Sequence, residues 1–211
     1  MKITKQEVFP ILFYEFLFSA DQIAPLVEEI QNKKEIIKKK YNDSPTDPEL
    51  GVPDYWTDYN DPIKLLEYEK LIKEIPPRFL PELYCEQIAY WTAIYEKKGY
   101  HGAHNHNPML YNIPSCNMSS VLSLSDIGHT DFFNPRQSDE IYPSILIPSA
   151  TGRMIIFPAH ILHRAAPHGK KDAERIVVSS NWRIYFFDKD RPRYSMPYPP
   201  PPKQERGPKW E

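Results

Sequence analysis

Short segments of strand-like composition follow one another through the second half of the chain, and this succession constrains the fold most. They are rich in β-branched and aromatic residues, and turn-forming residues such as Gly128 and Gly152 separate them. The expected strands cover residues 88–95, 118–124, 144–147, 153–157 and 175–187. Many short strands after a helical segment predict an α+β fold that is mainly β, with a sandwich or barrel core.

The N-terminal part is expected to supply the helices that buttress this core, after an aromatic opening strand over residues 8–18. The pattern Ser19-x-x-Gln22 has the form of a capping box and predicts a helix start. A start at Asp21 is the alternative, because it would place Pro25 in the first turn, where proline is tolerated. Further helices are expected from Asp61 to Ile75 and near residues 79–85.

The chain is expected to form a single domain over residues 1–189, with the helical buttress at about 19–85 and the barrel at about 86–189. Residues 190–211 are rich in proline and predict a polyproline-II-like tail. Such a tail lies on the surface, stays disordered or serves as a docking segment for a partner.

Composition excludes several classes of protein. The formal net charge is −2 and the pI is about 6.4, which argues against a nucleic-acid-binding domain. No run approaches the ~20 apolar residues of a membrane span, and no signal peptide is recognisable. The two cysteines, Cys85 and Cys116, do not make a disulfide framework. We therefore expect a cytoplasmic protein.

All seven histidines lie between His101 and His168. Residues i and i+2 of a strand point to the same face, so His104 and His106 can converge on one metal. His163 follows the expected strand 153–157, and Arg175 opens the next one. If these two strands pair in antiparallel fashion, Arg175 returns to the level of His163. Three protein ligands with open positions beside them are typical of non-haem Fe(II) centres.

Five segments together resemble a known family: residues 99–108, 119–121, 131–136, 152–163 and 175–181. The sequence is similar to 2-oxoglutarate/Fe(II) oxygenases of marine bacteria and their phages, a family similar to prolyl hydroxylases. The resemblance covers most of residues 8–187 and is best marked over 95–182. It implies a double-stranded β-helix, or jelly roll, that uses Fe(II), 2-oxoglutarate and O2. In such enzymes the cosubstrate is oxidised to succinate and CO2 while the substrate is hydroxylated.

The resemblance also implies roles for individual residues. His104 matches the first metal ligand, His163 the distal ligand, and Arg175 the arginine that binds the far carboxylate of 2-oxoglutarate. Two further cosubstrate contacts, at weaker matches, are Tyr95 and Ser120.

The third ligand departs from the pattern, because prolyl hydroxylases place aspartate where this chain has His106. We expect His106 to be the third ligand. The alternatives are that His106 orients a ligand through a hydrogen bond or contacts the substrate. Three neutral imidazoles would leave the iron with one more net positive charge than two histidines and a carboxylate. A competing set contains His129-Thr-Asp131, which supplies a carboxylate but lies close to His163 in the sequence.

Other functions remain open at this point. The barrel could be a cupin-like metal-binding module, or a three-histidine dioxygenase that does not use 2-oxoglutarate. Arg175 discriminates among these hypotheses, because an ion pair with Glu174 or Asp172 would give it a structural role instead of a role in binding 2-oxoglutarate. No G-x-S-x-G, P-loop or C-x-x-C motif is present, and Cys116 is expected to be a structural residue.

The substrate is not readable from the sequence, although the similarity to prolyl hydroxylases suggests a peptidyl or free amino acid, with a small molecule as the alternative. The aromatic residues Tyr55, Trp56 and Tyr59 either form a lid or anchor the loop 42–60. The oligomeric state is not predicted.

Overall fold

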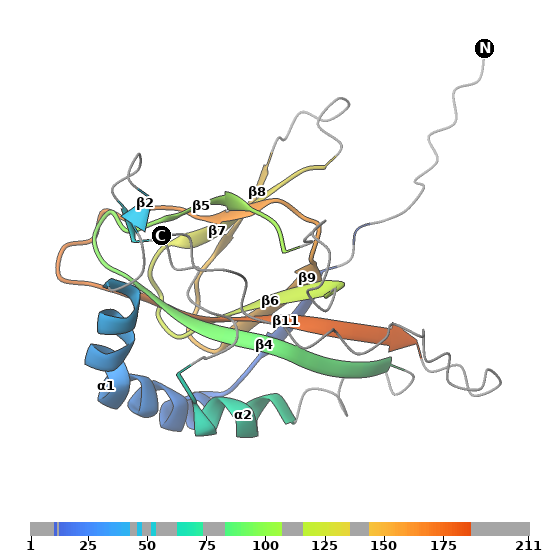
Figure 1. Ribbon diagram of the computed structural model, residues 1–211, viewed down its shortest axis with the longest axis horizontal. Coiled ribbons are helices and arrows are strands. Elements are labelled where there is room, and N and C mark those ends of the chain that lie inside the picture. Colours follow the sequence, from blue (N-terminus) through green and yellow to red (C-terminus); the bar gives the residue numbers. More distant parts are fainter. Residues whose placement is uncertain are drawn as a thin grey trace, which may run out of the picture.

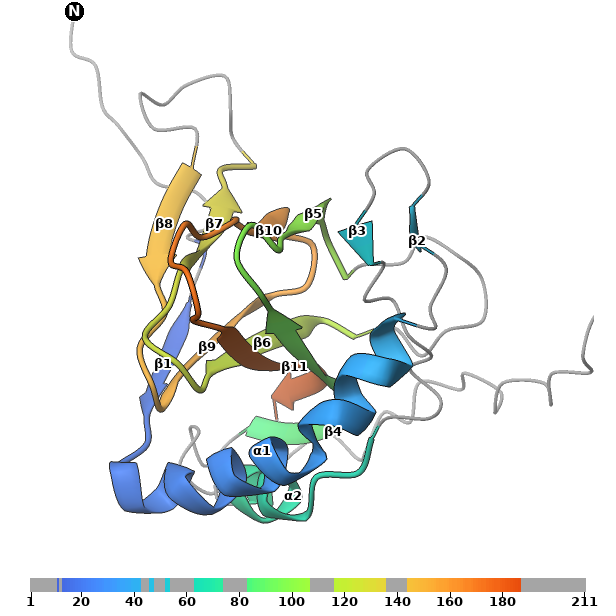
Figure 2. The ribbon, with the colours of Figure 1, turned by 90° about the vertical axis from the view of Figure 1, so that its left-hand side faces the viewer.

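Two antiparallel β-sheets face each other, and two helices cover the outer face of the larger sheet (Figures 1 and 2). The computed structural model describes residues 11, 13–42, 46–47, 52–53, 63–73, 83–106, 116–135 and 144–186. The larger sheet has the strand order β1-β9-β6-β11-β4 and the smaller β5-β10-β7-β8. The larger sheet contains β1 (Tyr14–Leu17), β9 (Arg153–Pro158), β6 (Met118–Ser123), β11 (Arg175–Phe186) and β4 (Leu83–Tyr95). The smaller contains β5 (His101–His104), β10 (His163–Ala165), β7 (His129–Phe133) and β8 (Ser144–Pro148), while β2 (Thr46–Asp47) and β3 (Val52–Pro53) pair separately.

Alternation along the strands of the larger sheet gives it two different faces. On β9, Met154 and Ile156 belong to a core cluster that also contains residues of the helices. Ile155 and Phe157, between and after them, pack instead with Phe132 of the smaller sheet. The core therefore has two layers, one between sheet and helices and one between the sheets.

Helix α1 (Ala20–Asn42) begins at the predicted capping box. The Gln22 side chain accepts a hydrogen bond from the Ser19 amide at 3.0 Å, and the Gln22 amide donates to Ser19 Oγ at 3.4 Å. Pro25 consequently lies inside the helix, at a cost of about 3 kcal/mol. The helix tolerates it because four side chains are buried against the sheet, each stabilising by about 1.5–3 kcal/mol: Ile23, Leu26, Ile30 and Ile37.

Helix α2 (Leu66–Lys73) begins later than expected, and residues 63–65 are not helical. Its start is set by α1, because the Glu29 carboxylate accepts hydrogen bonds from the amides of Leu66 and Glu67 at 2.9 and 2.8 Å. A carboxylate 37 residues away in the sequence thus replaces the expected local cap at Asp61, which lies outside the described residues. The third expected helix is wrong at residues 83–85, which belong to β4.

The expected strands are confirmed, with the opening strand limited to Tyr14–Leu17 among the described residues. The antiparallel pairing considered for the strands before His163 and after Arg175 does not occur. Strand β6 lies between β9 and β11, and Arg175 pairs with Tyr95 of β4. No helix among the described residues is long and apolar enough to cross a membrane. The tail 190–211 and the three aromatic residues of the loop 42–60 lie outside the described residues.

Candidate metal centre

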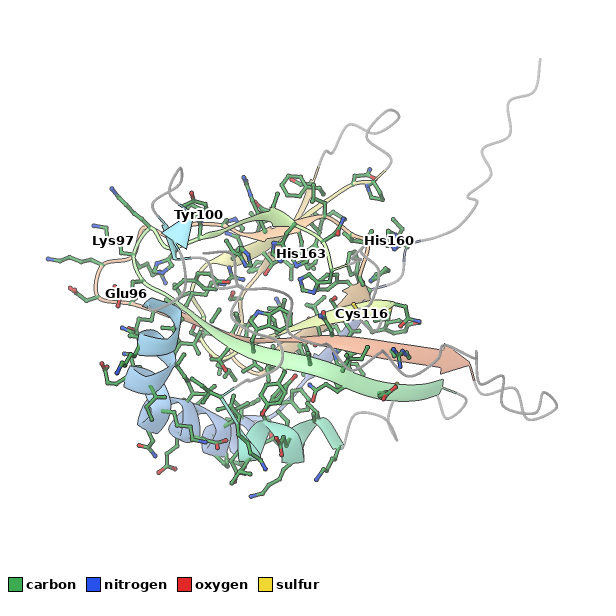
Figure 3. The ribbon with its side chains drawn as sticks, in the orientation of Figure 1. Glu96, Lys97, Tyr100, Cys116, His160 and His163 are labelled. Atoms are coloured by element: carbon green, nitrogen blue, oxygen red, sulfur yellow. The ribbon has the colours of Figure 1, made fainter. Side chains whose placement is uncertain are left out.

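Three imidazoles converge between the two sheets. His104 ends β5 and is the cross-strand partner of His163, which begins β10. His106 lies two residues beyond the end of β5, where its amide donates to the carbonyl of Ala159 at 2.8 Å. One ring nitrogen from each histidine lies within 4.8 Å of those of the other two. Figure 3 shows His163 in the space between the sheets.

The hydrogen bonds of these rings identify the nitrogens that face one another. His104 Nδ1 lies 2.7 Å from the carbonyl oxygen of Gly102, and His163 Nδ1 lies 3.0 Å from that of Ile161. A carbonyl oxygen only accepts, so in the neutral rings each Nδ1 carries the proton and each Nε2 keeps its lone pair. His106 Nδ1 lies 2.7 Å from Asn181 Oδ1, which is likewise an acceptor. All three Nε2 atoms are thereby left as potential metal ligands.

Burial keeps these imidazoles neutral. Desolvation, together with the nearby His104, lowers the pKa of His106 to about 4. Desolvation also lowers the pKa of His104, and it holds the pKa of His163 well below its ordinary value. The Nε2 atoms of His104 and His106 are only 3.1 Å apart, so two lone pairs face each other in a buried place. A divalent transition metal that prefers imidazole, such as iron, fits this donor set.

The competing carboxylate does not join the three histidines. Asp131 accepts from Arg164 Nε at 2.7 Å and lies 3.2 Å from His129 Nε2. Its neighbour Phe132 faces the core between the sheets. Within the described part of the chain, the three histidines form the only group of three or more metal-ligating side chains. The proposed third ligand is therefore an imidazole.

Arg175 is 1% exposed and makes no ion pair among the described residues. Its Nη2 donates to Thr130 Oγ1 at 2.7 Å and its Nε to Ser149 Oγ at 3.2 Å. Its Nη1 is buried without a hydrogen-bond partner in the described part of the structure. Burial lowers the pKa of this guanidinium, and the charges of the nearby Tyr95 and Asp131 partly offset that decrease. Such a group is suited to receive an anion from outside the chain.

The acids next to Arg175 in the sequence do not neutralise it. Glu174 pairs instead with Lys34 at 2.6 Å and Lys38 at 2.8 Å, both on α1. Lys38 also pairs with Glu96, which follows Tyr95. These ion pairs tie α1 to the strand ends at Arg175 and Tyr95 and leave the guanidinium itself unpaired.

A single pocket joins the histidines to Arg175. Its lining consists of Trp91, Tyr95, His101, His104, His106, Val121, Thr130, His163, Ala165, Arg175, Val177 and Ser179. The guanidinium carbon of Arg175 lies 5.5 Å from the ring centroid of Tyr95. Five of the six residues predicted for the site thus lie on one pocket.

Ser120 is the exception and needs correction. Its side chain is buried on the helix-facing side of β6, where Ser120 Oγ accepts from Trp182 Nε1 at 2.8 Å. Strand alternation turns its neighbour Ser119 toward the site, with Oγ 2.8 Å from His106 Nδ1. The structure therefore separates Ser120 from the pocket.

Asn181, Trp91 and Thr130 are among the site residues that were not assigned a role from the sequence. Asn181 lies six residues after Arg175 and Trp91 four before Tyr95, so each shares a strand face with a predicted residue. That even spacing could have found both. Thr130 lies on β7, a strand that was not expected.

No protein-family model matches the chain, and no curated protein matches it significantly in sequence. Its fold is similar to that of solved prolyl hydroxylases and of a non-haem α-ketoglutarate-dependent epimerase. The viral collagen prolyl hydroxylase of Paramecium bursaria Chlorella virus-1 matches with a TM-score of 0.53 and 16% identity, over 87% of this chain and 98% of that one.

Two other solved structures have similar scores. A Trichoplax adhaerens prolyl hydroxylase, in complex with a peptide fragment of the hypoxia-inducible factor oxygen degradation domain, has a TM-score of 0.53 and 13% identity, over 84% of each chain. The non-haem α-ketoglutarate-dependent epimerase SnoN from nogalamycin biosynthesis has a TM-score of 0.55 and 12% identity, over 84% of this chain and 81% of the other.

Proposed function

We propose that this protein is a 2-oxoglutarate- and Fe(II)-dependent dioxygenase that hydroxylates a peptidyl or amino-acid substrate. One observation carries the proposal. Three imidazoles that present their Nε2 atoms share a pocket with a buried arginine whose Nη1 has no partner among the described residues. The first feature suits a divalent metal and the second suits a carboxylate.

His104, His106 and His163 would hold the iron through their Nε2 atoms. Bound Fe(II) supplies the redox chemistry by which O2 and 2-oxoglutarate are consumed. The protein contributes fixed ligands, because each Nδ1 is held by a protein oxygen: Gly102 O, Ile161 O and Asn181 Oδ1. Phe157 packs against the His163 ring, with centroids 4.7 Å apart, and limits water on that side.

Arg175 would bind the far carboxylate of 2-oxoglutarate through Nη1, while Thr130 and Ser149 hold the rest of the guanidinium. The Tyr95 ring lies beside the guanidinium and restricts its position. Three neutral ligands leave the metal one charge more positive than a set with a carboxylate, which favours a dianionic cosubstrate.

The three histidines alone would also suit a three-histidine dioxygenase that uses no 2-oxoglutarate. Arg175 favours the 2-oxoglutarate enzyme, because a buried guanidinium nitrogen that has no hydrogen-bond partner among the described residues would otherwise only destabilise the fold.

The remaining features of the proposal are consistent with one another. The two facing sheets, with α1 and α2 packed against the larger one, support the jelly roll that the resemblance to marine bacterial and phage oxygenases implies. O2 is the second cosubstrate. The peptide in the Trichoplax complex supports a peptidyl substrate.

The test is an anaerobic titration with Fe(II) and 2-oxoglutarate, followed by visible absorption. We expect the charge-transfer band of a chelated cosubstrate, and we expect His104→Ala and His163→Ala to abolish it. His160→Ala is the matched control, because His160 is exposed and lies outside the pocket lining (Figure 3). Iron binding without the band would favour the three-histidine alternative, and no iron binding would reject both.

A further inference from the structure

We propose that Asn181 is a positioning residue that determines which nitrogen of His106 carries the proton. This inference rests on the proposed function, since it explains how an imidazole serves as the third ligand. A carboxylate at that position presents acceptor oxygens whichever way it turns, whereas a neutral imidazole presents a lone pair from only one tautomer. A histidine in the place of the carboxylate therefore needs a second residue that selects the tautomer.

The contacts around His106 Nδ1 define that selection. Asn181 Oδ1 lies 2.7 Å from Nδ1, Ser119 Oγ lies 2.8 Å from it, and Ser119 Oγ lies 3.1 Å from Asn181 Oδ1. Asn181 Oδ1 accepts only, so it takes the hydroxyl proton of Ser119 and the Nδ1 proton of His106. The Ser119 hydroxyl, already donating to Asn181, offers Nδ1 only a lone pair. Asn181 Oδ1 therefore keeps the His106 proton on Nδ1 and leaves Nε2 without a proton, while the Ser119 hydroxyl, which Asn181 orients, does not oppose this tautomer.

The fold holds this group of three in place. Asn181 and Ser119 are cross-strand partners on β11 and β6. His106 is 6% exposed, and its ring lies 5.4 Å from that of Trp91. Protein groups, and not solvent, therefore determine which ring nitrogen of His106 carries the proton.

Loss of the Asn181 side chain should reverse the assignment. Without Oδ1 as its acceptor, the Ser119 hydroxyl can turn and donate to His106 Nδ1, which must then give up its own proton. The proton moves to Nε2, where it meets the lone pair of His104 Nε2 at 3.1 Å. The resulting hydrogen bond between two rings would occupy two of the three ligand positions at once.

The first experiment measures Co(II) affinity, with Co(II) alone as the probe, in the parent protein and in three variants. Asn181→Leu should weaken binding about ten- to a hundredfold. Asn181→Asp keeps an acceptor at the same place and should bind Co(II) at least as tightly as the parent. Ser119→Ala is the matched control, because it removes an equally close neighbour of Nδ1 that does not select the tautomer, and it should stay within about threefold of the parent.

The second experiment reads the tautomer of His106 in the metal-free protein by long-range 1H–15N NMR of the imidazole ring. We expect Nδ1–H in the parent, in Ser119→Ala and in Asn181→Asp, and Nε2–H in Asn181→Leu. If Asn181→Leu keeps the Nδ1–H tautomer and the parental Co(II) affinity, the inference is overturned. If Asn181→Leu does not fold, weaker Co(II) binding by Asn181→Asp overturns it as well.

The two readouts separate this inference from the proposed function. A parent protein that binds no Co(II), but whose tautomers follow the expected pattern, would reject the metal centre and still support the role of Asn181. If the parent binds Co(II) but Asn181→Leu changes neither the Co(II) affinity nor the tautomer of His106, the metal centre is supported and the role of Asn181 is rejected.

Discussion

Replacing Arg175 by methionine should weaken cosubstrate binding without weakening the fold. The side chain is 1% exposed, and its Nη1 has no partner within the described structure. A charge-assisted hydrogen bond to a carboxylate contributes about 1.5–3 kcal/mol, so its loss should weaken 2-oxoglutarate binding about 10- to 150-fold. Iron affinity should not change, because Arg175 does not contact the three histidines through any hydrogen bond.

The stability of the same variant distinguishes a binding arginine from a structural one. Arg175→Met loses hydrogen bonds to Thr130 and Ser149, about 1 kcal/mol each. It also relieves the burial of an unpaired cation, which costs several kcal/mol. The free energy of unfolding should therefore stay within about 2 kcal/mol of the parent value. Removing one partner of a buried ion pair would instead cost about 3–5 kcal/mol.

The assay pairs two titrations with one unfolding curve. Iron and 2-oxoglutarate are titrated anaerobically, and denaturant unfolding is measured on the metal-free protein. Arg183→Met is the matched control, because Arg183 makes a partly exposed ion pair with Glu86 at 3.2 Å. Unchanged 2-oxoglutarate affinity, together with a large loss of stability in Arg175→Met, would refute the assignment.

Three further predictions follow from the same geometry. A Cβ at Gly128 would lie 3.1 Å from Arg175 Cδ, at a φ of +74°, so Gly128→Ala should weaken 2-oxoglutarate binding about tenfold in a titration while iron affinity stays constant. Ser120→Ala should leave that affinity unchanged but lower the unfolding free energy by about 1–3 kcal/mol, because Trp182 Nε1 loses its buried acceptor. The metal-free protein should lose stability on acidification, since the pKa of His106 falls from 6.5 to about 4 on folding, and thermal unfolding across pH 4–7 measures this.

The sign of the pH effect follows from proton uptake. Between pH 4 and 6.5 the unfolded chain binds a proton at His106 that the folded chain does not, so stability present above pH 6.5 is lost as the pH falls, by roughly 3 kcal/mol at pH 4 for this residue alone. A His106→Gln variant should show a shallower slope, and identical slopes would contradict the reasoning. For Gly128, the control is Gly169→Ala, where a Cβ meets nothing within 4 Å.

Much of the larger sheet could be predicted because most of its strands contain runs of β-branched and aromatic residues between turn residues. Strand β9 matches the expected segment and follows Gly152, whose φ of +85° suits a turn before it. Strands β7 and β10 were not expected, since β10 has three residues and exists by pairing with β5 and β7. Local sequence carries little signal for a strand of this kind.

The candidate site could be predicted in its residue types but not in its geometry. Arg175 lies on the same pocket as His163, although β9 and β11 do not pair directly and β6 lies between them. Ser119 and Ser120 are adjacent and chemically alike, so only the register of β6 against its neighbours shows which of them faces the pocket. Composition alone does not show which of two adjacent strand residues faces the pocket.

Successive residues of β11 face opposite sides of the sheet, and this alternation restricts which insertions and deletions the strand can accept. Arg175 lines the pocket and Asn181 contacts His106 on the same face of β11, while Ser180 between them bonds to Tyr68 beneath the sheet. A single-residue deletion between Arg175 and Asn181 would turn one of these two away from the pocket while the other stayed. Relatives that conserve both functions should therefore vary this segment by substitution, and accept insertions or deletions only in pairs or beyond its ends.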